Sequence, residues 1–341
     1  MNSIPPEFCL ESIRDKGLLR QHPFGEVILW KQHEFHTWWN LFESQMEHPL
    51  SRTFINALVD TFELNNTIKD VRGLFRKRKL RHEVERISSL LGWGLVQLEE
   101  KRIVNSAHPL LSVAISHYTS ELFYQQRYKL RWTEPRPQIV QIETEVTPQI
   151  PLPQEHTKMP WSGKRTASVF VQSSLKLDVQ ETNELRLEGE RMVLIPIDSL
   201  ERFFSGCLPY APDSQHDWFD NQSTDLRAHE NLLKIIIRTT AEMFLSSDRP
   251  VYIVDGSSWD AYIEHYLQER GWGSIEERIY NSSTFEFEFS MTKERHFPLT
   301  LGMLIGIWER AHGRSSQISI HEKNDIFRVK IESLLEYKNQ C

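Results

Sequence analysis

The tripeptide Gly-Trp-Gly occurs twice in this chain, at residues 92–94 and again at residues 271–273. With 14 Gly and 10 Trp among 341 residues, a shuffled chain would contain this tripeptide roughly 0.02 times. Each copy follows a stretch with helical periodicity and precedes a strand-like stretch. A glycine there can end the helix in the left-handed conformation, and the tryptophan can fill the junction with the strand. The repeat therefore predicts two junctions of the same kind.

The residues around the two tripeptides also correspond, in the same order along the chain. An apolar run after a Gly-Glu pair comes first in each half, and a helix-like stretch with an aromatic pair follows it. Apolar residues at i, i+3 and i+4 then predict a helix, and alternating residues predict a hairpin at the end of each half. These features are Gly25-Glu26, Trp38-Trp39, 52–64 and 128–144 in the first half, and Gly189-Glu190, Phe203-Phe204, 231–245 and 315–333 in the second.

Together these correspondences predict an α+β fold made of two similar units that arose by internal duplication. Each unit would be an antiparallel sheet packed with helices. The length of 341 residues suits two domains with two cores. We place the units at residues 1–145 and 168–341, joined by a Pro-rich linker over 146–167 that is extended and semi-rigid. Alternation over residues 168–190 predicts an added hairpin that opens the second unit.

Composition restricts the partners and the compartment. The net charge of -7 and the pI near 6.1 argue against a broad nucleic-acid surface, which must be positive. No apolar stretch reaches the ~18 residues that span a bilayer, and the N-terminus lacks the pattern of a signal peptide. We therefore expect a cytoplasmic protein without membrane insertion. Cys9, Cys207 and Cys341 are too far apart in sequence to indicate a disulfide framework or a thiolate zinc site.

An apolar ligand pocket is predicted in the second unit, where phenylalanines alternate with Glu286 and Glu288. In a strand this alternation places three rings on one face and two acids on the other. Gly302 and Gly306, four residues apart on a helix, would allow a close approach, in the first place by the sheet. The predicted pocket residues are Trp272, Phe285, Phe287, Phe289, Gly302, Gly306 and Trp308.

A basic run in the first unit is the second candidate site. Such a run is commonly a solvated helix face, but it could bind phosphate or an acidic partner. It consists of Arg76, Lys77, Arg78, Lys79 and Arg81.

His33 and His36 lie three residues apart and could face the same way, as metal ligands do, but no third ligand is near them in the sequence. The corresponding positions in the second half are Asp198 and Glu201. The sequence contains no P-loop, dinucleotide-binding, nucleophile-elbow or H-E-x-x-H pattern. We therefore expect neither a metal nor a cofactor, and we identify no catalytic residue.

Several segments of the second half resemble the four-vinyl-reductase type of small ligand-binding domain. They are "LEGERMVLIPIDSLERFF", the second Gly-Trp-Gly and "FPLTLGMLIGIWERAHGRSSQISIHEKNDIFRVKIES". The resemblance covers residues 185–335 and, more faintly, 20–145. The superfamily includes trafficking-adaptor subunits and the sensory domains of aromatic-responsive transcription activators. The resemblance implies a mixed fold, an apolar pocket and a tendency to dimerise, while both terminal hairpins lack the cysteines that hold a metal in many members.

These patterns lead to a main functional hypothesis and two alternatives. The main hypothesis is a non-catalytic sensor of a small apolar molecule, or a protein-interaction scaffold, in which the two units pair with each other or form a homodimer. The first alternative is an accessory enzyme of tetrapyrrole or aromatic metabolism that uses Glu286, Glu288, His296 or His312. The second is an adaptor that binds an acidic partner through the basic run over residues 76–81.

Overall fold

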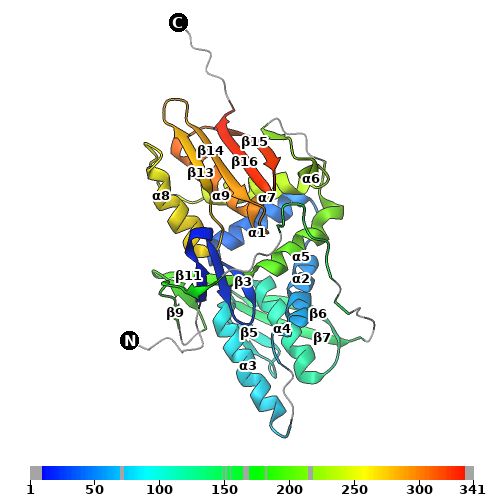
Figure 1. Ribbon diagram of the computed structural model, residues 1–341. Coiled ribbons are helices and arrows are strands. Elements are labelled where there is room, and N and C mark those ends of the chain that lie inside the picture. Colours follow the sequence, from blue (N-terminus) through cyan, green and yellow to red (C-terminus); the bar gives the residue numbers. More distant parts are fainter. Residues whose placement is uncertain are drawn as a thin grey trace.

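The two halves of the chain meet in the middle of the molecule and extend to opposite ends of it (Figure 1). The computed structural model describes residues 10–69, 73–147, 149, 152–153, 155–163, 169–180, 183–213 and 218–334. Cys9 and Cys341 lie outside these residues. Cys207 is buried, and burial raises the pKa of its thiol.

The elements of the first half follow the predicted order of strands and helices. They are β1 (Leu10–Ile13), a 3-10 turn (Arg14–Lys16), β2 (Leu18–Gln21), β3 (Gly25–Lys31), α1 (Gln32–Met46), α2 (Ser51–Leu64), α3 (Arg76–Leu91), β4 (Leu95–Gln97), β5 (Arg102–Val104), α4 (Pro109–Tyr124), β6 (Tyr128–Arg136) and β7 (Ile139–Val146).

The second half repeats this order with additional short elements. They are β8 (Val171–Gln172), β9 (Asp178–Val179), β10 (Leu185–Leu187), β11 (Glu190–Pro196), α5 (Ile197–Cys207), a 3-10 turn (Leu208–Tyr210), β12 (Phe219–Asn221), α6 (Thr224–Arg227), α7 (Glu230–Leu245), α8 (Ser258–Tyr262), a π-helix (Ile263–Leu267), a 3-10 turn (Gln268–Arg270), β13 (Glu276–Asn281), β14 (Glu286–Thr292), α9 (Phe297–His312), β15 (Ser316–Lys323) and β16 (Ile326–Ser333).

Each half ends in its own antiparallel sheet packed with helices, as the sequence predicts. The order is β4-β5-β7-β6 in the first half and β13-β14-β16-β15 in the second, where β12 adds a parallel strand beside β15. The α+β class is thus confirmed. The two sheets connect equivalent elements in the same way, but the origin of the halves by duplication stays a prediction.

A third sheet joins the halves. Its strand order is β8-β1-β2-β3-β11-β10-β9, so that β3 and β11 lie side by side at its centre. They pair antiparallel, with Leu29 opposite Leu194. The outer strands β8 and β9 are separated in the chain only by residues 173–177. Six residue steps reach at most about 22 Å, whereas the edges of seven flat strands would lie about 29 Å apart. The central sheet must therefore curl.

Helices of each half pack against helices of the other half next to the paired strands β3 and β11. α1 starts directly after β3 and packs against α7, while α5 starts directly after β11 and packs against α2. The two aromatic pairs seen in the sequence meet here: the ring centroids of Trp39 and Phe203 are 5.7 Å apart and those of Trp38 and Phe204 are 6.3 Å apart. The buried apolar side chains of both halves consequently form a single connected cluster. The expectation of two separate cores was wrong, because the chain builds its core across the boundary.

The two Gly-Trp-Gly junctions have the same structural role in the two halves. Gly92 and Gly271 follow their helices with φ of 70° and 74°, the left-handed conformation expected of a helix end. Trp93 donates its indole N–H to the carbonyl of Leu194 over 3.0 Å, and Trp272 donates to the carbonyl of Leu29 over 3.2 Å. Each tryptophan therefore reaches the central strand of the opposite half.

These two hydrogen bonds satisfy two backbone carbonyls that lie beyond the paired parts of the neighbouring strands β2 and β10. Strand β2 pairs with β3 only as far as Val27, and β10 pairs with β11 only as far as Met192. The carbonyls of Leu29 and Leu194 lie beyond those points. A buried carbonyl without a hydrogen-bond donor destabilises the folded state. By supplying that donor, both tryptophans stabilise the central sheet.

The middle of the chain bears out two expectations only in part. The stretch 168–190 contains a hairpin, because β9 and β10 follow each other in the chain and pair antiparallel at one edge of the central sheet, but β8 pairs with β1 of the first half at the opposite edge. Most described residues of the predicted linker are exposed or half-buried, whereas Met159 and Trp161 are buried in the core. The alternating pattern was right about strands but carried no information on the distant partner of β8.

Replacing Trp93 or Trp272 by Phe should lower the free energy of unfolding by about 1–3 kcal/mol each, because each substitution leaves a buried carbonyl without its donor. Urea denaturation measures this. The control is Trp259→Phe, since Trp259 is equally buried but its indole N–H has no hydrogen-bond partner among the described residues. A loss as large in the control would contradict the role assigned to the two hydrogen bonds.

Candidate functional site

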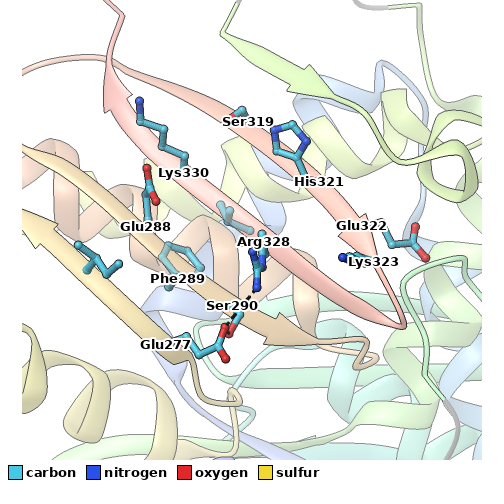
Figure 2. Close-up of a pocket in the computed structure, with 12 residues that line it drawn as sticks. Glu277, Glu288, Phe289, Ser290, Ser319, His321, Glu322, Lys323, Arg328 and Lys330 are labelled. Atoms are coloured by element: carbon cyan, nitrogen blue, oxygen red, sulfur yellow. Dashed lines mark hydrogen bonds and ion pairs between the residues drawn. The ribbon is translucent and has the colours of Figure 1, made fainter.

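An open groove lies on the sheet of the second half, on the face turned away from α7 and α9 (Figure 2). It has a volume of about 790 Å³ and crosses β13, β14, β16 and β15. Since residues alternate between the faces of a strand, apolar residues such as Phe287 and Ile331 are buried while polar neighbours line the groove. The lining residues are Glu277, Ile279, Glu288, Phe289, Ser290, Ser319, His321, Glu322, Lys323, Arg328, Val329 and Lys330.

The strand register places acids on one side of the groove and bases on the other. Lys330 lies opposite Glu288 on β14 and opposite Ser319 on β15. Arg328 occupies the same position in the next row, between Ser290 and His321. We call this surface the charged groove: its acidic side is on β13 and β14, and its basic side is on β15 and β16. Glu322 on β15 is the exception among the lining residues, and its carboxylate pairs with Lys293.

Ion pairs within the groove hold its long side chains in place. Lys330 Nζ lies 3.2 Å from Glu286 and 2.7 Å from Glu332, and these hydrogen bonds raise the pKa of its ammonium group. Figure 2 shows Arg328 pointing toward Glu277, at a distance of 3.9 Å. Such exposed pairs add little stability, typically below about 1 kcal/mol. A partner with complementary charge can therefore replace them at low cost.

The aromatic residues of the predicted apolar pocket are divided between two places. Phe287 and Phe289 lie on the inner face of β14, where Phe287 stacks on Trp259 at 4.0 Å, and Phe289 also borders the charged groove. Trp308 is also buried there and donates its indole N–H to the carbonyl of Phe285. Trp272 lies instead at the centre of the molecule, 4.7 Å from Trp30.

Gly302 and Gly306 allow a close approach by α7 rather than by the sheet. A Cβ on Gly302 would lie 2.5 Å from the carbonyl oxygen of Ile237, and one on Gly306 would lie 2.8 Å from Cβ of Phe244. Both glycines are thus explained by packing between α7 and α9. The seven predicted residues do not line one shared cavity among those found in the described residues, and binding of an apolar molecule stays a prediction.

The residues proposed for catalysis do not come together. Glu286 and Glu288 are on the outer face of β14, whereas His296 and His312 flank the two ends of α9. A helix of 16 residues separates its ends by about 24 Å. Burial lowers the pKa of His296 to about 3 and, together with Arg314, that of His312 to about 4. Both imidazoles are therefore neutral at neutral pH.

His33 and His36 have separate surroundings. His33 Nδ1 is 3.9 Å from Glu190, and the ring of His36 is 5.5 Å from that of His108. In the described residues, no group of three or more His, Cys, Asp or Glu side chains is arranged to hold a metal.

The basic run forms the first turns of α3, at the far end of the molecule from the charged groove (Figure 1). Its five residues fall into two groups. Arg76 donates to the carbonyls of Leu122 and Phe123 at the end of α4, and Arg81 pairs with Glu99. The other three, Lys77, Arg78 and Lys79, are exposed to solvent.

Comparisons with models of protein families, with curated proteins and with solved structures found no match. The resemblance to four-vinyl-reductase-type domains therefore stays a prediction. Sequence reasoning missed His321, Arg328 and Lys330 as site residues. The signal was present, because polar residues alternate with apolar ones through both strands of the terminal hairpin, but alternation does not tell which sheet face is left uncovered.

Two buried histidines should make the protein acid-sensitive. Burial lowers the pKa of His108 and of His296 to about 3, against about 6.5 in an unfolded chain. Between those values only the unfolded chain takes up the proton, so stability falls as the pH falls from about 6.5 toward 3, by about 1.4 kcal/mol per pH unit for each histidine.

Urea denaturation between pH 7 and pH 4.5 measures that slope. The variant His108→Asn keeps a side chain able to cap α4. It should make the slope shallower by the contribution of one histidine, about 1.4 kcal/mol per pH unit. The control is Gln317→Asn on β15, which removes no titrating group and should leave the slope as in the original chain. Equal slopes in all three proteins would refute the assignment.

Proposed function

We propose that this chain is a non-catalytic scaffold protein that holds a protein partner in the charged groove of its second half. The observation that carries the proposal is the open volume of about 790 Å³ between an acidic and a basic row of side chains. Opposite charges arranged in rows give specificity and fast association with a partner that bears the complementary rows.

The groove combines charged and apolar surface, a combination that suits a polypeptide. Ile279, which is 66% exposed, lines it together with Phe289, Val329 and a larger number of charged and hydroxylated side chains. The groove also runs across four strands, so it presents an extended surface rather than an enclosed cavity. An amphipathic helix or an extended segment with acidic and basic side chains fits such a surface.

The central sheet supports a scaffold by fixing the distance between the two ends of the molecule. The charged groove lies at one end and α3 at the other, with the joined β3 and β11 between them (Figure 1). Because the core is continuous, a partner bound at one end keeps a defined position relative to the other. The apolar-ligand alternative has its candidate side chains packed against one another, which is why we place it second.

Reversing the charge on the basic side of the groove tests the proposal. The double variant Arg328→Glu/Lys330→Glu should reduce recovery of the groove's partner at least tenfold, because like charges would then face each other across the interface. The measurement is quantitative affinity purification from the native cells, with the original chain as reference.

The matched control is Lys129→Glu/Arg131→Glu, which reverses two exposed bases on β6 of the first half. It should retain the partner. If the groove variant and the control recover the same proteins in the same amounts, or if both lose them equally, the groove is not the binding surface. Native mass spectrometry of the purified chain would reveal a bound small molecule, which would favour the sensor alternative instead.

A further inference from the structure

Two large apolar side chains project into solvent where α3 begins. Leu74 is 96% exposed and Phe75 is 63% exposed. They directly precede α3, which lies at the lower end of the molecule (Figure 1). Exposed apolar residues are common singly, but an adjacent pair beside exposed bases is typical of a contact surface. We call Leu74, Phe75, Lys77, Arg78 and Lys79 the α3 tip.

The α3 tip is held rigidly by the rest of the helix. Leu80, Val84 and Ile87 are buried on the inner side of α3. Arg76 binds the last carbonyls of α4, and the Lys77 ammonium lies 5.4 Å from the centre of the Phe123 ring. The apolar pair therefore directly precedes a helix that is anchored to the rest of the molecule.

Positive charge surrounds the apolar pair. Lys77, Arg78 and Lys79 are exposed, and within the described residues no carboxylate pairs with any of them. The chain as a whole carries a net charge of -7, so this positive surface is local. An anionic surface would attract the α3 tip and repel much of the rest of the molecule. The molecule would therefore approach such a surface with the α3 tip first.

We propose that the α3 tip docks on the surface of an anionic lipid bilayer. Leu74 and Phe75 would enter the boundary between headgroups and acyl chains, while the three bases would lie among anionic headgroups. Two adjacent apolar side chains next to several bases are the arrangement of a peripheral membrane contact, and an acidic protein partner is the alternative that the test below distinguishes. No helix among the described residues is long and apolar enough to cross a bilayer, and the proposed contact is confined to the surface.

The proposal is independent of the charged groove, which lies at the opposite end of the molecule. Sedimentation of the full chain with vesicles tests it, using phosphatidylcholine alone and phosphatidylcholine with about 30% phosphatidylserine. The chain should bind the anionic vesicles and not the neutral ones, and added salt should weaken the binding because exposed charges are screened.

Two variants separate the contributions of charge and apolar contact. Lys77→Gln/Arg78→Gln/Lys79→Gln should weaken binding about 100-fold, at roughly fivefold per base near an anionic surface. Leu74→Ser/Phe75→Ser should weaken it at least tenfold through the lost apolar burial. Circular dichroism should show both variants folded, because all five side chains are exposed and Arg76, which binds the end of α4, is unchanged.

Matched controls remove the same groups elsewhere. Lys129→Gln/Arg131→Gln/Arg136→Gln takes away three exposed bases on β6, and Tyr252→Ser/Val254→Ser takes away two side chains that are 75% and 76% exposed. Both controls should bind vesicles like the original chain. The proposal is overturned if the chain ignores anionic vesicles or if the controls lose binding as much as the variants. It is overturned in favour of an acidic protein partner if polyglutamate binding needs the three bases and vesicle binding does not need Leu74 and Phe75.

Discussion

The antiparallel pairing of β3 with β11 is the contact on which the rest of the structure depends. It brings Leu29 opposite Leu194, and each of these residues then accepts a hydrogen bond from a tryptophan of the other half. The helices that leave the two strands pack on α7 and α2, again across the boundary. Because backbone, indole and aromatic contacts all cross at the same place, the cores of the two halves are continuous.

The sequence predicted the local elements of this fold well, since periodicity and helix-ending glycines report short-range constraints. Residues 52–64 and 231–245 were expected as helices and form most of α2 and α7. The partners of distant strands were not predictable, because a strand such as β8 carries the same alternation whichever neighbour it has. Within 168–190, β9 and β10 form the expected hairpin, whereas β8 pairs with β1 of the first half.

The candidate site shows the same division between local pattern and long-range arrangement. The sequence indicated that Phe287 and Glu288 would point to opposite faces of one strand, and they do. The predicted ligand pocket was on the apolar face of this strand, but there the rings pack closely against α9 and Trp259. The uncovered face became visible only with the register of β14, β16 and β15. This register brings together charges from segments more than 50 residues apart in the chain, from Glu277 to Lys330.

The curl of the central sheet also bears on how this molecule can associate with others. Its two margins are strands of only two residues each, β8 and β9, and the five intervening residues draw these margins toward each other. An extended foreign segment would find too few free amide and carbonyl groups there to continue the ladder. Growth of this sheet by strand addition, the usual route to fibrils and swapped assemblies, is thereby blocked at the part of the molecule that both halves share.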